Sequence, residues 1–466
     1  MAMRGAVVAA SLALMVAAAS CSGGSSNGSK AGGDGGSSGG GSGGSGSGGS
    51  SGAGSGGSSG SGGSSGGSGS SSGSSSSSGG DGGGSCLGAS LLAAVGKSHL
   101  LLGGAMASAT ASAAPFDLQY DYISGGLAPG SGPCTSCATG CGASWWGCGW
   151  QYDMDPPGAY VRELAASTAQ ESPPQIPMIT YYQLLQSSGV TEGAPEVTQA
   201  ATDATFMSRY FADWRFLLQQ VGQTVFLLHI EPDFWGYAEQ HGADPTAEPA
   251  AVATANSVDC GSMPNTIAGM GQCMIAMVRT YAPHALVALH ASAWSTNIDV
   301  AGNTDPSLDV AGEAKKTAAF LAACGESQAD YVVVETSDRD AGYYTCQGRD
   351  VWWDDTNTAL PDFQQAFTWT TALTTALGKP ALYWQTPLGN INMPAGCPAS
   401  GQTQSTWQDN RVAYFFGHMD ELAAAHAVGA VFGAGAAGQT TPETDGGYFL
   451  SQAKAYYAAG GQALCP

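Results

Sequence analysis

Short apolar runs alternate with amphipathic stretches through most of this 466-residue chain, and this alternation constrains the fold more than any other feature. Most runs lack polar residues at alternate positions, which is typical of strands covered on both faces. Strands that alternate with helices form parallel βαβ units. We predict strands at 99–103, 116–123, 177–184, 225–230, 285–290, 331–334, 380–385 and 429–433.

Amphipathic patterning predicts helices in the intervals between most of these strands, although none is evident between the first and the second. The expected helices are 206–220, 266–281, 313–324, 363–377, 411–427 and 449–458. Eight such units in a chain of this length favour an α/β fold, a (β/α)₈ TIM barrel. An open doubly wound sheet is the alternative. Against it, no Gly-rich phosphate loop follows the first strand and no GxxxxGK motif occurs.

The N-terminal part divides from the rest by composition. Residues 1–20 combine Arg4 with an apolar run too short to span a bilayer, which predicts a secretory signal peptide. Small residues precede Cys21, and this arrangement resembles a bacterial lipoprotein processing site, which implies lipidation of Cys21. Residues 21–85 are almost wholly Gly and Ser, so we expect a disordered linker. The barrel is then predicted to span 86–466.

Charge and cysteine content limit the class of partner. The net charge of −22 disfavours nucleic acid and anionic lipid, and it is compatible with an uncharged glycan. Twelve cysteines are typical of an exported protein. Cys134, Cys137, Cys141 and Cys148 have spacing that could suit zinc, but disulfides are favoured outside the cytosol. Cys86 and Cys465 could join the ends of the barrel, although sequence alone does not establish the pairing.

Carboxylates follow two of the predicted strands directly. The run VFLLHIEPDFWGY ends the fourth strand with Glu231 and Asp233, and YVVVETSDRD ends the sixth with Glu335, Asp338 and Asp340. The carboxyl ends of barrel strands meet at one face, where active sites lie. Hydrolysis of a glycosidic bond needs two carboxyl groups facing each other. We therefore predict Glu231 and Glu335 as the catalytic pair of a glycoside hydrolase.

Aromatic rings and amides at the other strand ends suit a sugar, because rings stack on C–H faces while polar groups bind hydroxyls. The predicted substrate-binding residues are Asp121, Tyr181, Tyr182, Asp233, Trp235, Trp294, Asp338, Asp340, Trp384 and Gln385. Structural roles remain possible for several polar residues at the strand ends. Asp338, Arg339 and Asp340 could form a self-satisfied ion cluster, and His229 is better explained as a core histidine than as a base.

These strand-end residues resemble those of secreted (β/α)₈ glycoside hydrolases. The largest retaining group of that fold has a Glu after the fourth strand, as Glu231 is, and a nucleophilic Glu after the seventh, where this chain has Gln385. The α-galactosidase-like group instead uses acids after strands four and six. Glu231 and Glu335 match that placement, although that group has Asp at both positions. The resemblance implies a carbohydrate substrate.

The expected protein is a monomeric hydrolase that uses no cofactor and no metal, with carbohydrate as its partner and no nucleic acid. It is held to the bacterial cell envelope, at the outer membrane or the cell surface, only by lipid on Cys21. One alternative is a non-catalytic glycan-binding barrel that has lost the reaction. Another is a metal-dependent hydrolase using His229, His290 and Asp233, which the absence of closely spaced ligands such as HExxH disfavours.

Overall fold

A closed ring of eight parallel strands forms the centre of the computed structural model, which describes residues 86–125, 127, 143–144, 147–148 and 158–465. The barrel predicted from the sequence is confirmed. Neighbouring strands follow the order β1-β10-β9-β8-β7-β6-β5-β2, so β1 closes the ring against both β2 and β10. The strands are β1 (Leu101–Gly104), β2 (Leu118–Ser124), β5 (Ile176–Tyr182), β6 (Leu227–Ile230), β7 (Leu286–Ala291), β8 (Val332–Glu335), β9 (Ala381–Thr386) and β10 (Ala427–Phe432).

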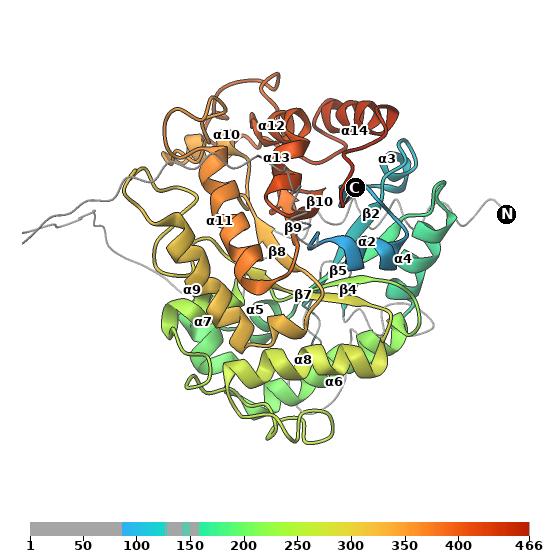
Figure 1. The fold of residues 1–466 in the computed structure, drawn as a ribbon, viewed down its shortest axis with the longest axis vertical. Coiled ribbons are helices and arrows are strands. Elements are labelled where there is room, and N and C mark those ends of the chain that lie inside the picture. Colours follow the sequence, from blue (N-terminus) through green and yellow to red (C-terminus); the bar gives the residue numbers. More distant parts are fainter. Residues whose placement is uncertain (1–85, 126, 128–142, 145–146, 149–157, 466) are drawn as a thin grey trace, which may run out of the picture. The chain divides into compact units, whose positions relative to one another are not determined.

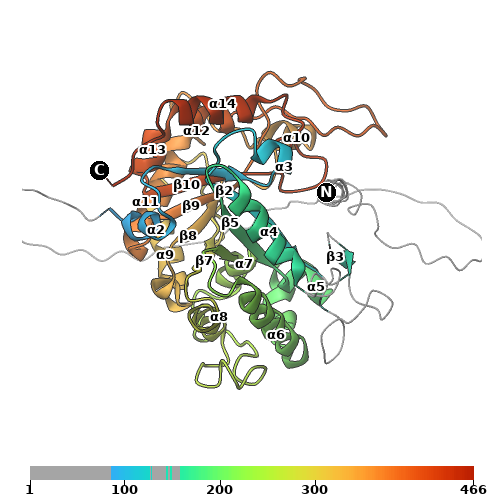
Figure 2. The same cartoon turned by 90° about the vertical axis from the view of Figure 1, so that its right-hand side faces the viewer.

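Helices surround this ring on its outer side (Figure 1). Figure 2 shows the same strands lying side by side in the middle of the barrel domain with helices around them. The larger helices among the described residues are α4 (Ala159–Gln170), α6 (Ala204–Val221), α8 (Ile267–Tyr281), α9 (Val310–Ala323), α11 (Phe363–Leu377) and α14 (Tyr448–Ala458). The shorter ones are α2 (Ala89–Val95), α3 (Ser108–Ala111), α5 (Leu184–Ser188), α7 (Phe234–His241), α10 (Ala341–Cys346), α12 (Arg411–Gly417) and α13 (Met419–Ala424), with a π-helical turn at Glu196–Ala200 and a 3₁₀ turn at Glu326–Gln328. A two-stranded pair, β3 (Ala143–Ser144) and β4 (Gly147–Cys148), lies outside the ring of strands.

Side-chain caps explain where several helices begin. The Asp203 carboxylate accepts hydrogen bonds from two backbone N–H groups in the first turn of α6. Thr266 caps α8 through the Gly269 N–H, and Asp362 caps α11 through the Gln365 N–H. Such caps satisfy backbone donors that have no partner within the helix.

Three helical segments differ from the sequence-based expectation, and one of them, α4, was not expected at all. The helix expected at 411–427 is broken into α12 and α13 at His418, whose backbone leaves the helical region. The His418 ring stacks on Tyr414, with ring centroids 3.9 Å apart. The connection between β1 and β2 does hold a helix, α3, but its four residues are too few to show a periodic pattern.

Two apolar layers stabilise the barrel. Alternate residues of the strands, including Leu118, Leu227 and Leu382, pack against one another inside the ring. The intervening residues, such as Leu228 and Val332, pack outward against the helices. Because side chains of a strand alternate between faces, each strand-end residue belongs to one layer or the other.

Disulfides join segments that are distant along the chain. The Cys86–Cys465 bridge suggested by the sequence is present, and it links the two ends of the barrel domain. Cys260–Cys273 and Cys346–Cys397 are also paired. Cys324 is buried and is the free thiol among the described residues. None of the described helices combines the length and the apolarity needed to cross a lipid bilayer.

Candidate active site

The mouth of the barrel, at the carboxyl ends of the strands, gathers inward-facing polar and aromatic side chains. Most of them lie two residues after an apolar residue that fills the interior, so they point to the same inner face of the sheet. The inward-facing residues nearest the mouth are Tyr122, Tyr182, His229, His290, Glu335 and Trp384.

Two carboxylates and one imidazole converge at this mouth. One carboxylate oxygen of Asp233, one of Glu335 and one ring nitrogen of His290 all lie within 4.8 Å of one another. Glu335 is the last residue of β8, and its side chain keeps 13% of its surface exposed. The Nε2 atom of His290 lies 3.9 Å from a Glu335 oxygen. The close carboxylate pair in the structure is therefore Asp233 with Glu335.

Both carboxyl groups hold their protons more tightly than free carboxylic acids do. Burial, followed by the charges of Glu192 and Asp338, raises the pKa of Asp233 to about 7. Burial, followed by the charges of Asp233 and Asp338, raises the pKa of Glu335 well above its ordinary value. The Tyr182 hydroxyl opposes the shift at Asp233 by stabilising its ionised form. Because two facing carboxyl groups do not both ionise readily, the pair favours keeping a proton.

The backbone after β6 turns sharply and brings Asp233 to the mouth. Glu231 and Asp233 both have left-handed backbone angles, with φ of 47° and 67°. This conformation is costly for residues with a Cβ atom, by about 1–3 kcal/mol each, and such strain clusters at functional sites. The turn also redirects Glu231, which simple strand alternation would have placed inward.

Glu231 lies away from Glu335, in the layer behind the strands. Its side chain is fully buried, and Oε1 accepts hydrogen bonds from the backbone N–H groups of Gln183 and Leu184, each at 3.0 Å. The Tyr210 hydroxyl also hydrogen-bonds to it. Burial raises the pKa of Glu231 to about 8. These contacts hold the start of α5 against β6, and the catalytic role predicted for Glu231 stays a prediction.

Three predicted substrate-binding residues face the helices. The Tyr181 hydroxyl donates to Asp213 on α6 at 2.9 Å, and Trp235 donates from Nε1 to the Ile230 carbonyl at 2.9 Å. Both side chains are buried in the outer core. Asp121 hydrogen-bonds to Tyr160 on α4, and burial raises the pKa of Asp121 to about 6.

Asp338 lies beside the carboxylate pair and is tied to its neighbours. It forms an ion pair with Arg339 and accepts a hydrogen bond from the Tyr344 hydroxyl. Its charge contributes to the raised pKa values of both Asp233 and Glu335. Part of the ion cluster considered from the sequence is thus present, between Asp338 and Arg339.

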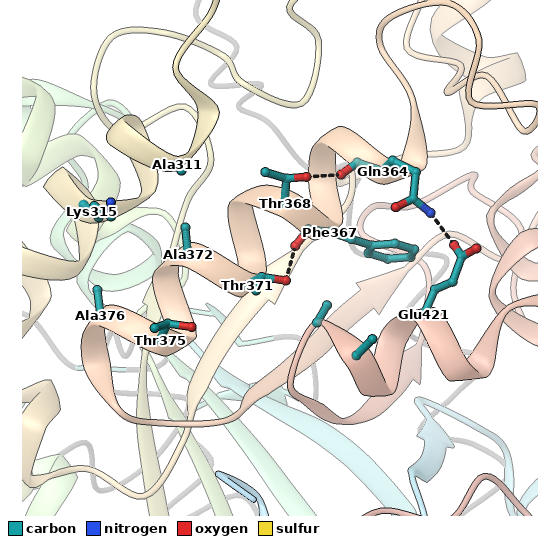
Figure 3. Close-up of a pocket in the computed structure, with 12 residues that line it drawn as sticks. Ala311, Lys315, Gln364, Phe367, Thr368, Thr371, Ala372, Thr375, Ala376 and Glu421 are labelled. Atoms are coloured by element: carbon teal, nitrogen blue, oxygen red, sulfur yellow. Dashed lines mark hydrogen bonds between the residues drawn. The ribbon is translucent and has the colours of Figure 1, made fainter. Parts of the chain in front are cut away.

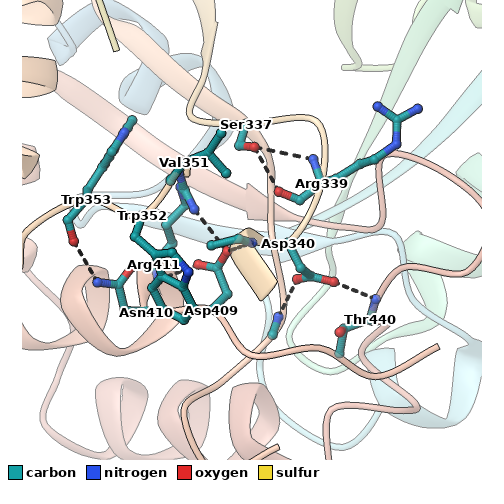
Figure 4. Close-up of polar contacts among 12 residues, drawn as sticks. Ser337, Arg339, Asp340, Val351, Trp352, Trp353, Asp409, Asn410, Arg411 and Thr440 are labelled. Carbon is teal, nitrogen blue, oxygen red and sulfur yellow. Dashed lines mark hydrogen bonds and ion pairs between the residues drawn. The ribbon is translucent and has the colours of Figure 1, made fainter. Parts of the chain in front are cut away.

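Asp340 belongs to a different network, and the Arg339 side chain extends away from it (Figure 4). Its carboxylate accepts hydrogen bonds from the backbone N–H groups of Gly389 at 2.8 Å and Thr440 at 2.9 Å. Burial and the charge of Asp409 raise the pKa of Asp340 to about 7. Asp409 in turn pairs with the buried Arg411 at 2.9 Å. Asp340 therefore joins three loops next to the mouth.

Aromatic and amide side chains border the carboxylate pair. Trp294 is partly exposed, hydrogen-bonds to Glu335, and lies 4.8 Å from the Tyr237 ring between centroids. Trp384 is buried inside the barrel, where its ring meets those of Tyr122 and His229. These flat surfaces beside acids suit a polyhydroxylated ring.

The Gln385 side chain reaches the barrel interior, although simple alternation along β9 would point it outward, toward the helices. Its backbone is left-handed, with φ of 52°, and its Oε1 accepts a hydrogen bond from the Tyr122 hydroxyl. It is buried, with 5% of its surface exposed. The amide that stands where a retaining barrel enzyme has its nucleophile is thus held by a tyrosine within the site.

A shallow groove also lies on the outside of the barrel, between α9, α11 and α13 (Figure 3). Alanine and threonine side chains of α11 form much of its floor, and Gln364 donates a hydrogen bond to Glu421 at 2.6 Å across one end. The groove contains none of the residues predicted for the site.

Sequence reasoning undervalued His290 and Asp233. His290 follows an apolar run and looks like a core residue, and only the β6–β7–β8 pairing shows that it lies beneath the carboxylates. Asp233 was predicted to contact substrate, while the structure pairs it with Glu335. Cys21, Cys134, Cys137 and Cys141 lie outside the described residues, as does the side chain of Cys148.

Comparison of the sequence with protein-family models gave no match, and neither did comparison with curated proteins. Solved structures similar to this chain include a β-1,4-mannanase from the common sea hare Aplysia kurodai, with 12% identity, a TM-score of 0.41, and coverage of 79% of this chain and 96% of that one. A glycoside hydrolase family 5 mannosidase from Rhizomucor miehei has 11% identity, a TM-score of 0.40, and coverage of 75% and 85%. A protein from Burkholderia cenocepacia J2315, provisionally described as a lyase/mutase, has 10% identity, a TM-score of 0.30, and coverage of 75% and 81%. Similarity at this level does not bear on the chemistry of the mouth.

Proposed function

We propose that this chain is a glycoside hydrolase that cleaves an oligosaccharide or polysaccharide with Asp233 and Glu335. One observation carries the proposal: these two carboxylates, from the ends of β6 and β8, approach within 4.8 Å at the mouth of the barrel. The raised pKa values of both groups favour a pair that keeps a proton between them. Glycoside hydrolysis requires one group in each state.

The environments of the two groups assign their roles. We assign Glu335 as the general acid, because burial and the charge of Asp233 favour its protonated form. Asp233 is the ionised partner, because the Tyr182 hydroxyl stabilises its negative form. A separation of about 5–5.5 Å between carboxyl groups is typical of retaining enzymes, whereas inverting enzymes need about 6.5–9.5 Å for a water. The short separation supports retention, with Asp233 as the nucleophile.

Three matched variants test this assignment on a panel of plant, fungal and bacterial polysaccharides. Reducing ends released by the unaltered protein are compared with those released by Asp233→Asn, Glu335→Gln and Glu231→Gln. We expect losses of about 10²–10⁴-fold for the first two variants. Glu231→Gln should keep most of the activity, because glutamine resembles the protonated acid that its buried site favours.

Each outcome decides between the pairs. Full activity in Asp233→Asn together with a large loss in Glu231→Gln would return the catalytic role to Glu231. Binding of a glycan without release of any reducing end, in the unaltered protein as well as the variants, would establish the non-catalytic barrel. Proton NMR of the anomeric product distinguishes retention from inversion.

We also propose that lipid on Cys21 holds the enzyme at the cell envelope. Support comes from the apolar run and the small residues before Cys21, followed by a Gly/Ser-rich stretch that suits a flexible spacer. Cys21→Ser should move the protein from the membrane fraction to the medium. Unchanged membrane association of this variant would contradict the proposal.

A further inference from the structure

His290 presents an unused ring nitrogen to the carboxylate pair. The residue lies on β7, is fully buried, and its Nδ1 is 3.1 Å from Nε2 of His229. Within the described part of the chain, Nε2 of His290 has no hydrogen-bond partner. The nearest Glu335 oxygen is 3.9 Å away, beyond hydrogen-bonding distance. Buried polar atoms nearly always have a partner, so we expect this nitrogen to bind a group from outside the chain, such as a water or an ion.

The spacing of the surrounding ligand atoms suits a small cation. The His290 nitrogen and one oxygen each of Asp233 and Glu335 form a triangle whose edges are at most 4.8 Å. Bonds of about 2.0–2.2 Å from a tetrahedral zinc ion place its ligands about 3.3–3.6 Å apart. Closing the triangle onto an ion therefore needs contraction of roughly 1 Å along an edge, which rotation of the two partly exposed carboxylates can supply.

A hydrogen-bonded chain behind His290 can fix the tautomer that binds metal. Nδ1 of His229 lies 3.2 Å from the Thr180 hydroxyl, in line with the contact between the two histidines. If each histidine carries its proton on Nδ1, His290 donates to His229 and His229 donates to Thr180. Nε2 of His290 then exposes a lone pair to the carboxylates. Metal-binding histidines are commonly held by such a second hydrogen bond.

The charges around the triangle also favour a cation. Asp338 and Glu192 add negative charge beside Asp233. Arg339 is the positive side chain that acts on this group, and it is already paired with Asp338. The chain as a whole carries a net charge of −22. A divalent ion would offset the repulsion between Asp233, Glu335 and Asp338.

We propose that Asp233, Nε2 of His290 and Glu335 bind one divalent transition-metal ion, with zinc as the best match, and leave a coordination position open toward the mouth. Imidazole together with carboxylate favours zinc over calcium and magnesium, which prefer oxygen ligands alone. Both carboxylates serve as ligands in this arrangement. In this respect the inference rests on the proposed function: an occupied triangle lacks a free acid, so the metal inhibits glycoside hydrolysis.

Cobalt(II) is the probe, because its visible d–d absorption reports coordination without any substrate. The full-length chain, stripped with EDTA and dialysed, is titrated with CoCl₂ and then with ZnCl₂. We expect one cobalt per chain, with the strong visible bands of four- or five-coordinate cobalt, and loss of these bands when zinc displaces it. His290→Gln and Glu335→Gln should each abolish the bands, and His229→Gln should weaken binding by about 10–100-fold.

The matched control is His241→Gln. His241 also contacts a carboxylate, that of Glu248 at 2.9 Å, but at an exposed site on α7. Bands that persist in both His290→Gln and Glu335→Gln, or that disappear in His241→Gln, would overturn the proposed site. Circular dichroism of each variant shows that the fold is retained, and Glu335→Gln keeps the test decisive if His290→Gln does not fold.

Hydrolysis measured in parallel separates this inference from the function on which it rests. We expect activity in EDTA and its loss at the zinc concentration that displaces cobalt. Cobalt binding without hydrolysis of any substrate would refute the proposed function and leave the metal site standing. Hydrolysis without cobalt binding would refute the metal site alone. Activity that is lost in EDTA and restored by zinc would overturn the inhibitory role.

Discussion

Buried acids at the two ends of the barrel have opposite environments. The end of the barrel opposite the mouth, at the amino ends of the strands, is here called the closed end. Asp117 lies there, just before β2, where it bonds to Lys97 at 2.7 Å and to His99 at 3.1 Å. Burial alone would raise the pKa of Asp117, but the hydrogen bonds from His99 and Lys97 and the charge of Lys97 outweigh burial and lower it. At the mouth, Asp233 and Glu335 face each other instead of a cation, and their pKa values rise.

The comparison shows that burial raises the pKa of each acid, while the neighbouring groups set the direction of the net shift. All three acids are largely withdrawn from water, so their difference comes from the groups around them. An acid surrounded by donors and cations stabilises the fold. An acid that faces another acid stores repulsion, which a substrate, a proton or a metal ion can relieve. Active sites tend to be of the second kind.

The largest effect on the free energy of unfolding should come from removing the charge of Asp117 at the closed end. Asp117→Asn leaves the Lys97 and His99 partners without a negative charge in a buried setting, which typically costs about 3–5 kcal/mol. Urea denaturation at pH 7 measures the change in the free energy of unfolding. The control is Asp338→Asn, which removes the partly exposed ion pair with Arg339 at the mouth and should cost no more than about 1 kcal/mol. Equal costs for the two variants would contradict the comparison.

The two ends should also respond to pH in opposite directions. The lowered pKa of Asp117 contributes stability above its unfolded value of about 3.9, and this contribution disappears as the pH falls through the folded pKa. The raised pKa of Asp233 contributes stability below about 3.9 that is lost as the pH rises through about 7. Asp233→Asn should therefore be more stable than the unaltered protein at pH 8 and similar to it at pH 4. Thermal melts at both values measure the difference.

A smaller effect is expected at Glu231, a buried acid whose Oε1 accepts two backbone hydrogen bonds. The pKa of about 8 means that Glu231 is mostly protonated at pH 6, so Glu231→Gln replaces one neutral acceptor of the Gln183 and Leu184 N–H groups with another. We expect the free energy of unfolding at pH 6 to change by less than about 1 kcal/mol. A loss of several kcal/mol would show that the ionised carboxylate holds α5 in place.

The smallest expected effect is a shift in the pH–activity profile. The charge of Arg339 lowers the pKa of Asp233, so Arg339→Gln should move the acidic limb of the profile upward by less than about half a pH unit, which corresponds to about 0.7 kcal/mol. The control is Arg279→Gln, whose partner Asp330 lies just before β8, at the closed end. An equal shift in both variants would indicate an effect of net charge alone.

The barrel was predictable because its signal lies in the pattern of the sequence. The apolar runs that become β5 to β10 recur along the chain with amphipathic stretches between most of them. Parallel pairing of the strands follows from these intervening helices. Some helical segments still escaped prediction. The helix α4 was not anticipated, the four residues of α3 are too few for a pattern, and His418 interrupts a helix through its own backbone.

The site was predictable only in part. Strand parity could have assigned Tyr181 and Asp121 to the outer layer, because they lie between the inward-facing Tyr120, Tyr122 and Tyr182. Parity fails after β6, where the left-handed backbone turns Glu231 outward and brings Asp233 in. The turn contains no glycine, the residue that adopts positive φ most readily, so its sequence does not predict this backbone conformation. The pairing of Asp233 with Glu335 therefore needed coordinates.

The bond between Cys86 and Cys465 makes the polypeptide between them a covalent ring. Cutting one peptide bond anywhere in that ring does not release a fragment, but converts the ring into a linear molecule with new ends. A protease that nicks a single loop thus leaves every strand attached to the rest. We expect this architecture to tolerate a permutation in which the two ends of the barrel domain are fused and new ends are opened in such a loop.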